Sequence, residues 1–397
     1  MVLQAVPAKG TRPRNRQAIT VTAAAELFHR RGFPSVSMAD IAAATNVGAS
    51  AIYRHFPGKS DLLVAAIHTG LVPYIESLRP LAPDEGIDAV FRRLAECALD
   101  SRAVGVLWQR DARYLSAEEA RPLRDDLFTI SSLISGHLVT SRPELDQQQV
   151  NTLAWCIMGA MVSISFHSIE LPREQFIDLL ARMCAEIAAA RFPTVAERVP
   201  DAVVPLPADA APDSRREALI TEATELFAER GFAAAGIDEI ADAAGIAGPA
   251  VYRHFPSKQF ILVAVVERSM AALHALTRPV LDADLPPELK LRRLVAAYVK
   301  RMNRSRFAMR ILISEMGELP DDKRAEFRRV QRQNVDDLVE LLCDITGWDA
   351  GSARIRVQAI LLVVNDAVQT PHLRTQPGFE PTIESIAQAI LGIDATL

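Results

Sequence analysis

The chain has 397 residues, of which 49% are hydrophobic and 23% are charged, and a formal net charge of −5 at pH 7. A prior of roughly 150 residues per domain predicts two or three domains, and the apolar content excludes a disordered protein. The four cysteines form no CxxC pair, so we expect neither a disulfide framework nor a metal site, and no cofactor. The negative net charge, taken alone, argues against a nucleic-acid partner.

No segment of the sequence is typical of a membrane protein. The first 16 residues, MVLQAVPAKGTRPRNR, lack the apolar stretch of a signal peptide. The most apolar segment, 154–166, has 13 residues and is too short to span a bilayer. We therefore expect a cytoplasmic protein without a membrane partner.

An internal repeat organises the chain. Residues 24–33 read AAELFHRRGF, and residues 223–232 read ATELFAERGF. Residues 51–59 read AIYRHFPGK, and residues 250–258 read AVYRHFPSK. Both pairs lie at the same offset of 199 residues, which predicts a duplicated unit of that length.

The first helix of each copy is predicted from its apolar spacing. Apolar or small residues recur at i, i+3, i+4 and i+7, which is the pattern of an amphipathic helix. The residues in this pattern are Val21, Ala24, Ala25 and Phe28 in the first copy and Ile220, Ala223, Thr224 and Phe227 in the second. Gly32 and Gly231 follow an arginine and are expected to end the helix in the left-handed conformation.

Two shorter helices follow in each copy. In the first copy the second helix is expected to begin after Ser37, a favourable N-cap residue, and to end at a tight turn over 46–48. The third helix is predicted over 49–55, before Pro57. The second copy repeats these elements after Gly236, over 245–247 and over 248–254, before Pro256. Three short helices with a turn before the last are typical of a helix-turn-helix, whose final helix enters the major groove.

The ordered set ELFxxRGF, an Ile-Ala pair and YRHFPxK resembles the DNA-binding domain of the TetR family. The resemblance implies an all-α fold, in which each helix-turn-helix is followed by a helical effector-binding and dimerisation domain. It also implies a bacterial repressor at the nucleoid, usually homodimeric, which a small molecule releases from an operator in double-stranded DNA. The phosphate contacts that it implies are Tyr53, His55 and Lys59 in the first copy and Tyr252, His254 and Lys258 in the second.

On this reading the chain has five parts. They are a first helix-turn-helix domain (9–60), a first helical effector and dimerisation domain (61–191), a proline-rich linker (192–213), a second helix-turn-helix domain (214–259) and a second helical effector and dimerisation domain (260–397). The linker contains five prolines, which favour an extended, semi-rigid conformation.

Base reading depends on few residues. Arg54 and Arg253 are the only long donors of the third helices and the best candidates to contact guanine, although a plain solvated arginine fits equally well. The neighbouring residues are small, so specificity rests on Ser50, Arg54, backbone amides and DNA shape. The other expected DNA contacts are Arg14, Arg16, Ser37 and Gly48.

Several of these residues have a structural alternative. Tyr53 could pack half-buried on the first helix, and His55 and Lys59 could be ordinary surface residues. Ile52 and Phe56 are expected in the core rather than on DNA.

Charge separates the two helix-turn-helix domains. Residues 9–59 contain eight basic and two acidic residues, a net +6, whereas residues 208–258 contain five and nine, a net −4. Because neutralised phosphates supply most non-specific affinity, the first domain is expected to dominate DNA binding. Its arm over 9–16 resembles a basic arm that reaches into a minor groove, although a solubilising tail is an alternative.

The copies are expected to act as an intramolecular pseudo-dimer, and further homodimerisation stays open. Helices near 150–168, 174–191, 353–370 and 381–393 would pair as a four-helix bundle, and the operator would be an imperfect palindrome. The effector is unknown. Candidate effector contacts, in a pattern that is more often typical of a core than of a pocket, are Trp108, Trp155, Met158, Met161 and Phe166.

Two other classes of function were weighed. The sequence has no HExxH, GxSxG, Walker or GxGxxG motif, so we do not expect an enzyme. The alternative to a DNA-binding regulator is a helical ligand sensor or scaffold whose acidic second helix-turn-helix domain binds protein rather than DNA.

Overall fold

The computed structural model describes residues 16–46, 48–81, 85–193 and 214–393, and every regular element in these ranges is helical. The all-helical expectation is therefore confirmed for the described residues. The chain divides into two compact units after Ala188. Arg14 and nearly all of the predicted linker lie outside the described residues.

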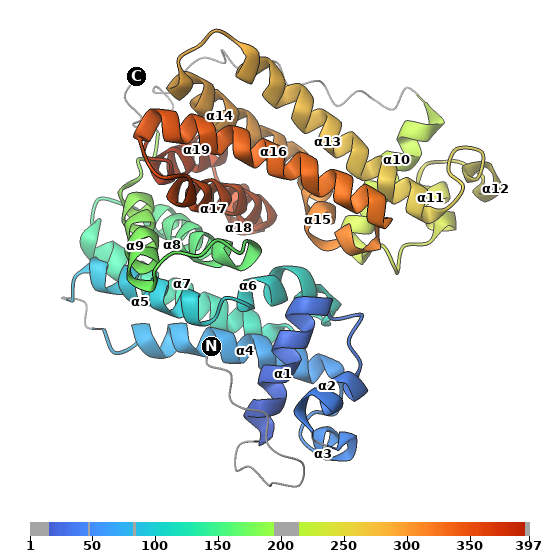
Figure 1. The fold of residues 1–397 in the computed structure, drawn as a ribbon, viewed down its shortest axis with the longest axis horizontal. Helices are drawn as coiled ribbons and strands as arrows, with labels where there is room; N and C mark the ends of the chain where they lie inside the picture. The colour runs from blue at the N-terminus through green and yellow to red at the C-terminus, as the bar shows by residue number, and fades with distance from the viewer. Residues whose placement is uncertain (1–15, 47, 82–84, 194–213, 394–397) are drawn as a thin grey trace. The chain divides into compact units, whose positions relative to one another are not determined.

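Unit 1 contains the first copy. Its helices are α1 (Arg16–Arg31), α2 (Met38–Thr45), α3 (Ala49–Tyr53), α4 (Lys59–Leu78), α5 (Ile87–Asp100), α6 (Val104–Val106), the π-helical turn η1 (Leu107–Asp111), the 3-10 turn η2 (Ala112–Tyr114), α7 (Arg121–Ser141), α8 (Gln147–Val162), the 3-10 turn η3 (Ser163–Phe166) and α9 (Arg173–Ala189). We call residues 16–60 the first head and residues 61–189 the first body. Helix α4 packs on α1 in the head and on α7 in the body, so it joins the two parts (Figure 1).

Unit 2 repeats this order. Its helices are α10 (Arg215–Arg230), α11 (Ile237–Ala243), α12 (Gly248–Val251), α13 (Lys258–Asp282), α14 (Pro287–Arg304), α15 (Arg306–Ser314), the 3-10 turn η5 (Met316–Glu318), α16 (Asp321–Thr346), α17 (Ala350–Gln369), α18 (Pro371–Arg374) and α19 (Phe379–Ile390). Residues 214–259 are the second head. The four helices predicted for a bundle are present as α8 with η3, α9, α17 and α19.

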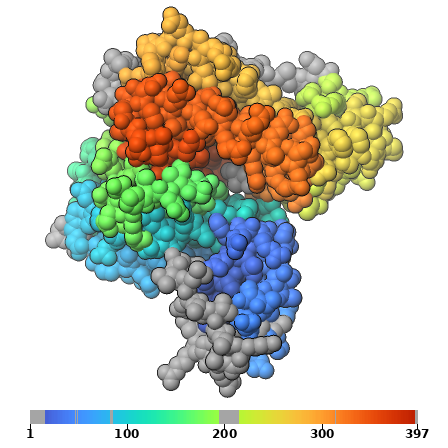
Figure 2. All heavy atoms as spheres, viewed as in Figure 1, coloured from blue at the N-terminus to red at the C-terminus, as the bar shows by residue number. Residues whose placement is uncertain are grey.

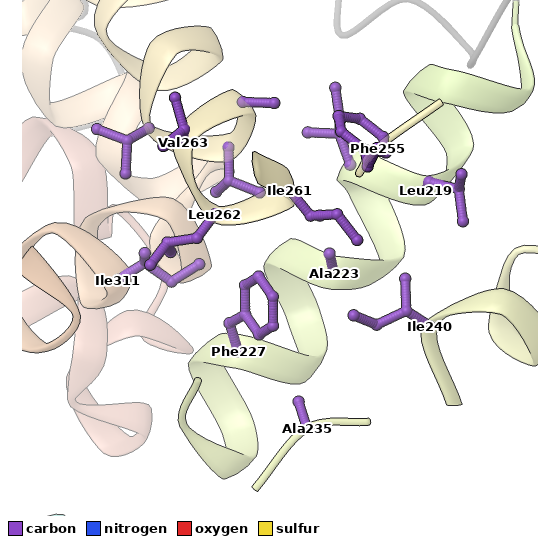
Figure 3. Close-up of a cluster of buried hydrophobic side chains, with 14 of the residues drawn as sticks. Leu219, Ala223, Phe227, Ala235, Ile240, Phe255, Ile261, Leu262, Val263 and Ile311 are labelled. Carbon is purple, nitrogen blue, oxygen red and sulfur yellow. The ribbon is translucent and has the colours of Figure 1, made fainter. Parts of the chain in front are cut away.

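Each head is built on the apolar face predicted for its first helix. In the second head, Phe227 and Ala223 of α10 are fully buried and meet Ile240 of α11 and Phe255, which follows α12 (Figure 3). Ile311 of α15 belongs to the same cluster, so the body closes the core of the head. Burial of each large side chain stabilises this core by about 1.5–3 kcal/mol. In Figure 2 the helices of the first head, in dark blue, lie at one end of unit 1.

The residues that end the first two helices of each head, or that form the turn after them, have the positive φ values expected from the sequence. Asn46 ends α2 in the left-handed conformation, with φ 53° and ψ 26°, and Gly245 has φ 66°. Gly32 and Gly231 have φ 80° and 82°. The ψ of Gly231 is 156°, however, so this glycine leaves the helix in an extended conformation that is not the predicted left-handed helical one.

The third helices are shorter than predicted. They end at Tyr53 and Val251, not at 55 and 254. The N–H of His55 bonds to the carbonyl of Ile52 at 3.0 Å, a tightened i to i−3 contact. Pro57 lacks an N–H and disfavours the helical conformation for the residue before it, which explains the early end.

Two helices are long and apolar enough to cross a membrane by length and composition alone. They are Gln147–Phe166, with mean hydropathy 1.3, and α13, with mean hydropathy 1.5. The expectation that the most apolar segment is too short was therefore wrong, because the helix extends beyond 154–166 in the N-terminal direction. The apolar window of the first helix is 61% buried inside the protein, as in a core helix, and that of α13 is 39% buried.

Candidate DNA-binding surfaces

The first head presents a row of polar side chains directly at the end of α3. Tyr53 is 51% exposed, and Arg54 and His55 are also exposed. The flanking residues Ile52 and Phe56 are buried, as predicted, and they anchor the row to the core. Within the described residues, Arg54 and His55 have no side-chain hydrogen bond or ion pair, so their donors face solvent.

The beginning of α3 is open. Gly48 is exposed, and a Cβ on it would meet no atom of the described structure within 4 Å. Ser50 is also exposed, one turn before Tyr53. In a helix-turn-helix the N-terminal residues of the last helix contact base edges, so this end is accessible to a duplex.

The second head repeats the exposed row. Tyr252 is 57% exposed, Arg253 and His254 are exposed, and Val251 and Phe255 are buried on either side. The scaffold that presents a recognition segment is therefore retained in both copies. The residues around the beginning of α12 differ from those in the first head.

Ser37 is the N-cap residue of α2, and Arg16 lies at the beginning of α1. The hydroxyl of Ser37 accepts the N–H of Asp40 at 3.1 Å, and the Asp40 carboxylate accepts the N–H of Ser37 at 2.8 Å, which forms a capping box for α2. The hydroxyl also donates to the Asp40 carboxylate at 2.6 Å. These hydrogen bonds from the Ser37 hydroxyl and N–H, with the charge of Arg31, lower the pKa of Asp40. The Ser37 side chain thus caps α2, and its expected contact with DNA remains a prediction. Arg16 is the first residue of α1 and is half-buried.

The two lysines after the prolines point into the protein. Lys59 Nζ donates to the carbonyl of Phe33 at 2.7 Å and lies 4.3 Å from the centroid of the Phe33 ring. Burial lowers the pKa of Lys59, and the charge of Asp111 acts in the opposite direction. The Lys59 side chain therefore folds back over the loop between α1 and α2.

The ammonium group of Lys258 makes more hydrogen bonds to the preceding loop than that of Lys59 does. Its ammonium donates to the carbonyls of Phe232 at 2.7 Å, Ala235 at 2.9 Å and Ala233 at 3.3 Å. An ammonium group has three donors, so Lys258 has none left for a phosphate in this arrangement. Both lysines thus contact backbone carbonyls of the preceding loop, and the phosphate contacts that the family resemblance implies remain a prediction.

The first body holds the first head through two residues that sequence reasoning missed. Arg110 of η1 donates to the carbonyl of Phe28 at 2.6 Å and to that of His29 at 3.3 Å. Asp111, which is 1% exposed, accepts the N–H of Phe33 at 3.3 Å and pairs with Arg110 at 2.7 Å. The available signal was an Arg-Asp pair inside an otherwise mostly apolar segment. The π-helical turn that aims both side chains at the head has no simple sequence signature.

The candidate effector residues differ in burial and in the contacts that they make. Met161 is buried and packs on Cys184 of α9, with the sulfur atoms 3.9 Å apart. Trp155 is half-buried and meets the ring of Phe128 edge-on at 5.6 Å. Met158 and Trp108 are half-buried, and Phe166 is 36% exposed. Met161 thus belongs to the core, and the other four remain candidates.

Comparison with known proteins shows which family the two heads resemble. The family described as "Bacterial regulatory proteins, tetR family" matches residues 21–66 and 219–265. The chain is 28% identical over 157 residues to the transcriptional activator FasR of Mycolicibacterium smegmatis, which covers 40% of this chain and 72% of that protein. It is 28% identical over 197 residues to the repressor KstR2 of Rhodococcus jostii, which covers 48% of this chain and 95% of that protein.

The solved structure of a TetR-family regulator from Bordetella parapertussis 12822 matches this chain with 19% sequence identity and a TM-score of 0.43. The match covers 47% of this chain and 98% of that protein's chain. The two family matches fall on the two heads, each with its buried scaffold and exposed row. The protein is therefore a TetR-family DNA-binding transcription regulator that carries two TetR-like units in one chain, and this family consists of regulators, not enzymes.

Proposed function

We propose that the chain represses transcription by binding an operator in double-stranded DNA through its first head, and that a small-molecule effector releases it. It would act on the nucleoid in the bacterial cytoplasm. TetR regulators bind operator DNA and small-molecule effectors. Of the two relatives named above, the one that matches the larger share of the chain is a repressor.

The observation that carries this proposal is the exposed row at the end of α3. Tyr53, Arg54 and His55 offer a phenol, a guanidinium and an imidazole to solvent, and their buried neighbours hold the row in place. Pre-positioned donors of this kind suit phosphates and guanine edges. The first head is also the basic one, so it attracts a duplex at long range.

We further propose that the two bodies pair within one chain as an intramolecular pseudo-dimer. Helices α8 and α9 of unit 1 have equivalents in α17 and α19 of unit 2, at the positions where the family pairs the helices of two subunits. One chain would then replace a homodimer. Sedimentation at micromolar concentration is expected to give the mass of one chain, and a stable two-chain species would contradict the pairing.

Selection of bound duplexes with the purified chain tests the DNA-binding proposal. The dissociation constant of the selected duplex should rise steeply with salt, by about 10³-fold or more between 50 and 200 mM if six or more phosphates are contacted. Arg54→Ala with His55→Ala should weaken binding at least tenfold and leave the melting temperature unchanged, because neither side chain has a partner in the described structure. Arg121→Ala, an equal loss of charge on exposed α7, is the control and should change affinity less than twofold.

Equal binding by the wild type and the double variant, at all salt concentrations, would contradict the proposal. It would favour the helical sensor or scaffold instead. The effector proposal is tested separately, since a ligand of the regulator should lower affinity for the selected duplex and raise the melting temperature of the free protein.

A further inference from the structure

The second head has a buried helix-turn-helix core like that of the first head, but its exposed residues differ in charge. At the common offset of 199 residues, Arg30, Ala39 and Ala43 of the first head correspond to Glu229, Asp238 and Asp242 of the second. All three acidic residues are exposed. The buried partners beneath them, including Phe227, Ile240 and Val251, still form a complete core. The difference between the heads is therefore one of surface charge and not of folding.

Asp238 lies where the recognition helix begins. Its Oδ1 is 2.8 Å from the position that a Cβ on Gly248, the first residue of α12, would take. The equivalent of Gly248 in the first head is Ala49, and the equivalent of Asp238 is Ala39, which has no charge. The N-terminal residues of this helix are the ones that approach base edges and the adjoining phosphates. In the second head the carboxylate of Asp238, which belongs to α11, therefore lies beside them.

Three of the five basic residues of the second head are already engaged, and one of them is Arg216, which pairs with Glu217 at 3.5 Å. Arg230 is paired with Glu239 at 2.6 Å, and the ammonium of Lys258 is occupied by three carbonyls. Pro249 stands where the first head has Ser50, so a hydroxyl donor is also missing. Within residues 248–254, which are α12 and the three residues after it, Arg253 is the only long cationic side chain. The two carboxylates of Asp238 and Asp242 in α11 exceed this single positive charge.

We propose that Asp238 and Asp242 prevent the second head from binding DNA, so that each chain binds a single half-site through its first head. This inference rests on the proposed function, because it assumes that the first head binds DNA. Like-charge repulsion at short range, in a site from which a duplex excludes water, is the physical cause. The operator of one chain is then one half-site, and the imperfect palindrome expected from the sequence is not required.

The first head supplies the residues for the decisive variant. Glu229→Arg, Asp238→Ala and Asp242→Ala together give the second head the side chains of the first at those positions. On a duplex with two copies of the selected half-site, the wild-type footprint should cover one half-site per chain, and the triple variant should protect both. Its affinity should rise at least tenfold, and its salt dependence should become steeper because more phosphates are neutralised. Thermal melting checks that each variant remains folded.

A matched control uses an acid that both heads share. Glu225 corresponds to Glu26 in the first head, so Glu225→Ala removes one negative charge without restoring the first-head pattern. Its footprint should equal that of the wild type. In the wild-type background, Arg253→Ala should change affinity less than twofold, whereas Arg54→Ala should weaken binding at least tenfold.

The outcomes separate the two proposals. A wild type that binds and is weakened by both Arg54→Ala and Arg253→Ala overturns the proposal that the second head is prevented from binding DNA and leaves the proposed function intact. Weaker binding by Asp238→Ala also overturns it, because that result would mean that the carboxylate accepts a hydrogen bond from a cytosine amino group. A wild type that binds no selected duplex overturns both proposals.

Discussion

The carboxylate of Asp111 accepts a hydrogen bond from the backbone N–H of Phe33 at 3.3 Å, across 78 positions of the sequence. This contact joins the first body to the loop between α1 and α2 of the first head. Arg110, beside it, bonds to the last carbonyls of α1, including those of Phe28 and His29. The carbonyl of Phe28 also accepts the N–H of Gly32 at 2.8 Å, so Arg110 adds a second donor there and the body supports the C-terminal end of α1.

Asp111→Asn should weaken unit 1. The carboxylate is almost fully buried and paired with Arg110, and removal of one partner from such a pair leaves an uncompensated charge. Arg110 retains some solvent exposure, so we expect a loss of about 2–3 kcal/mol in the free energy of unfolding. Urea unfolding of the chain measures it. Asp125→Asn, on the exposed face of α7, is the control and should leave the midpoint unchanged.

Lys258→Met should destabilise the second head without a change in DNA affinity. The substitution leaves the carbonyls of Phe232, Ala233 and Ala235 without their donor, at a cost of about 1–3 kcal/mol in unfolding free energy. Arg253→Met, at an exposed side chain, serves as the control and should leave unfolding unchanged. Unchanged stability with reduced duplex affinity for Lys258→Met would instead assign this lysine to phosphate binding.

Protonation of His167 should make unit 1 less stable at acidic pH. Burial and the nearby charge of Arg102 lower the pKa of His167 from 6.5 to about 4. Between these values the unfolded chain binds a proton that the folded one does not, so stability falls as the pH drops from 6.5 towards 4. The contribution is at most about 3 kcal/mol, with a slope of about 1.4 kcal/mol per pH unit.

His167→Asn keeps an acceptor for Arg102 and the N–H of Ile169, and it should remove this slope. The same substitution at exposed His55 is the control. Urea unfolding at intervals from pH 4 to 7 measures both. A slope that is identical in wild type and His167→Asn would exclude His167 as its source.

Gly105→Ala and Gly136→Ala should have opposite effects. A Cβ on Gly105 would lie 2.5 Å from Ser165 Oγ and 2.6 Å from Val162 Cγ1, so α6 would have to move away from η3 and from the end of α8. We expect a loss of about 1–3 kcal/mol in unfolding free energy. A Cβ on Gly136, within α7, meets nothing within 4 Å, and alanine there should stabilise by about 0.5–1 kcal/mol. Thermal melting compares the two, and equal shifts would contradict the close packing at Gly105.

Local pattern predicted most of each head. The buried faces of the first helices, the positive φ of Asn46 and the burial of Ile52 and Phe56 follow from spacing and residue type within a few positions. The exposure of Tyr53 was not decided by this pattern, which also allowed the ring to pack half-buried on the first helix. The ends of the third helices were missed, because the boundary is decided by tightening of the last turn before Pro57.

The sequence by itself therefore determined the duplication, the all-helical class, the two helix-turn-helix scaffolds and the unequal charge of the heads, since each is encoded by local period or by composition. Only the tertiary structure decided that Lys59 turns back to Phe33 26 positions away, that Asp111 reaches the head, and that Asp238 lies over the beginning of α12. These contacts join residues from different elements. Their partners are selected by how helices pack, and helix packing is not contained in the pattern of any one segment.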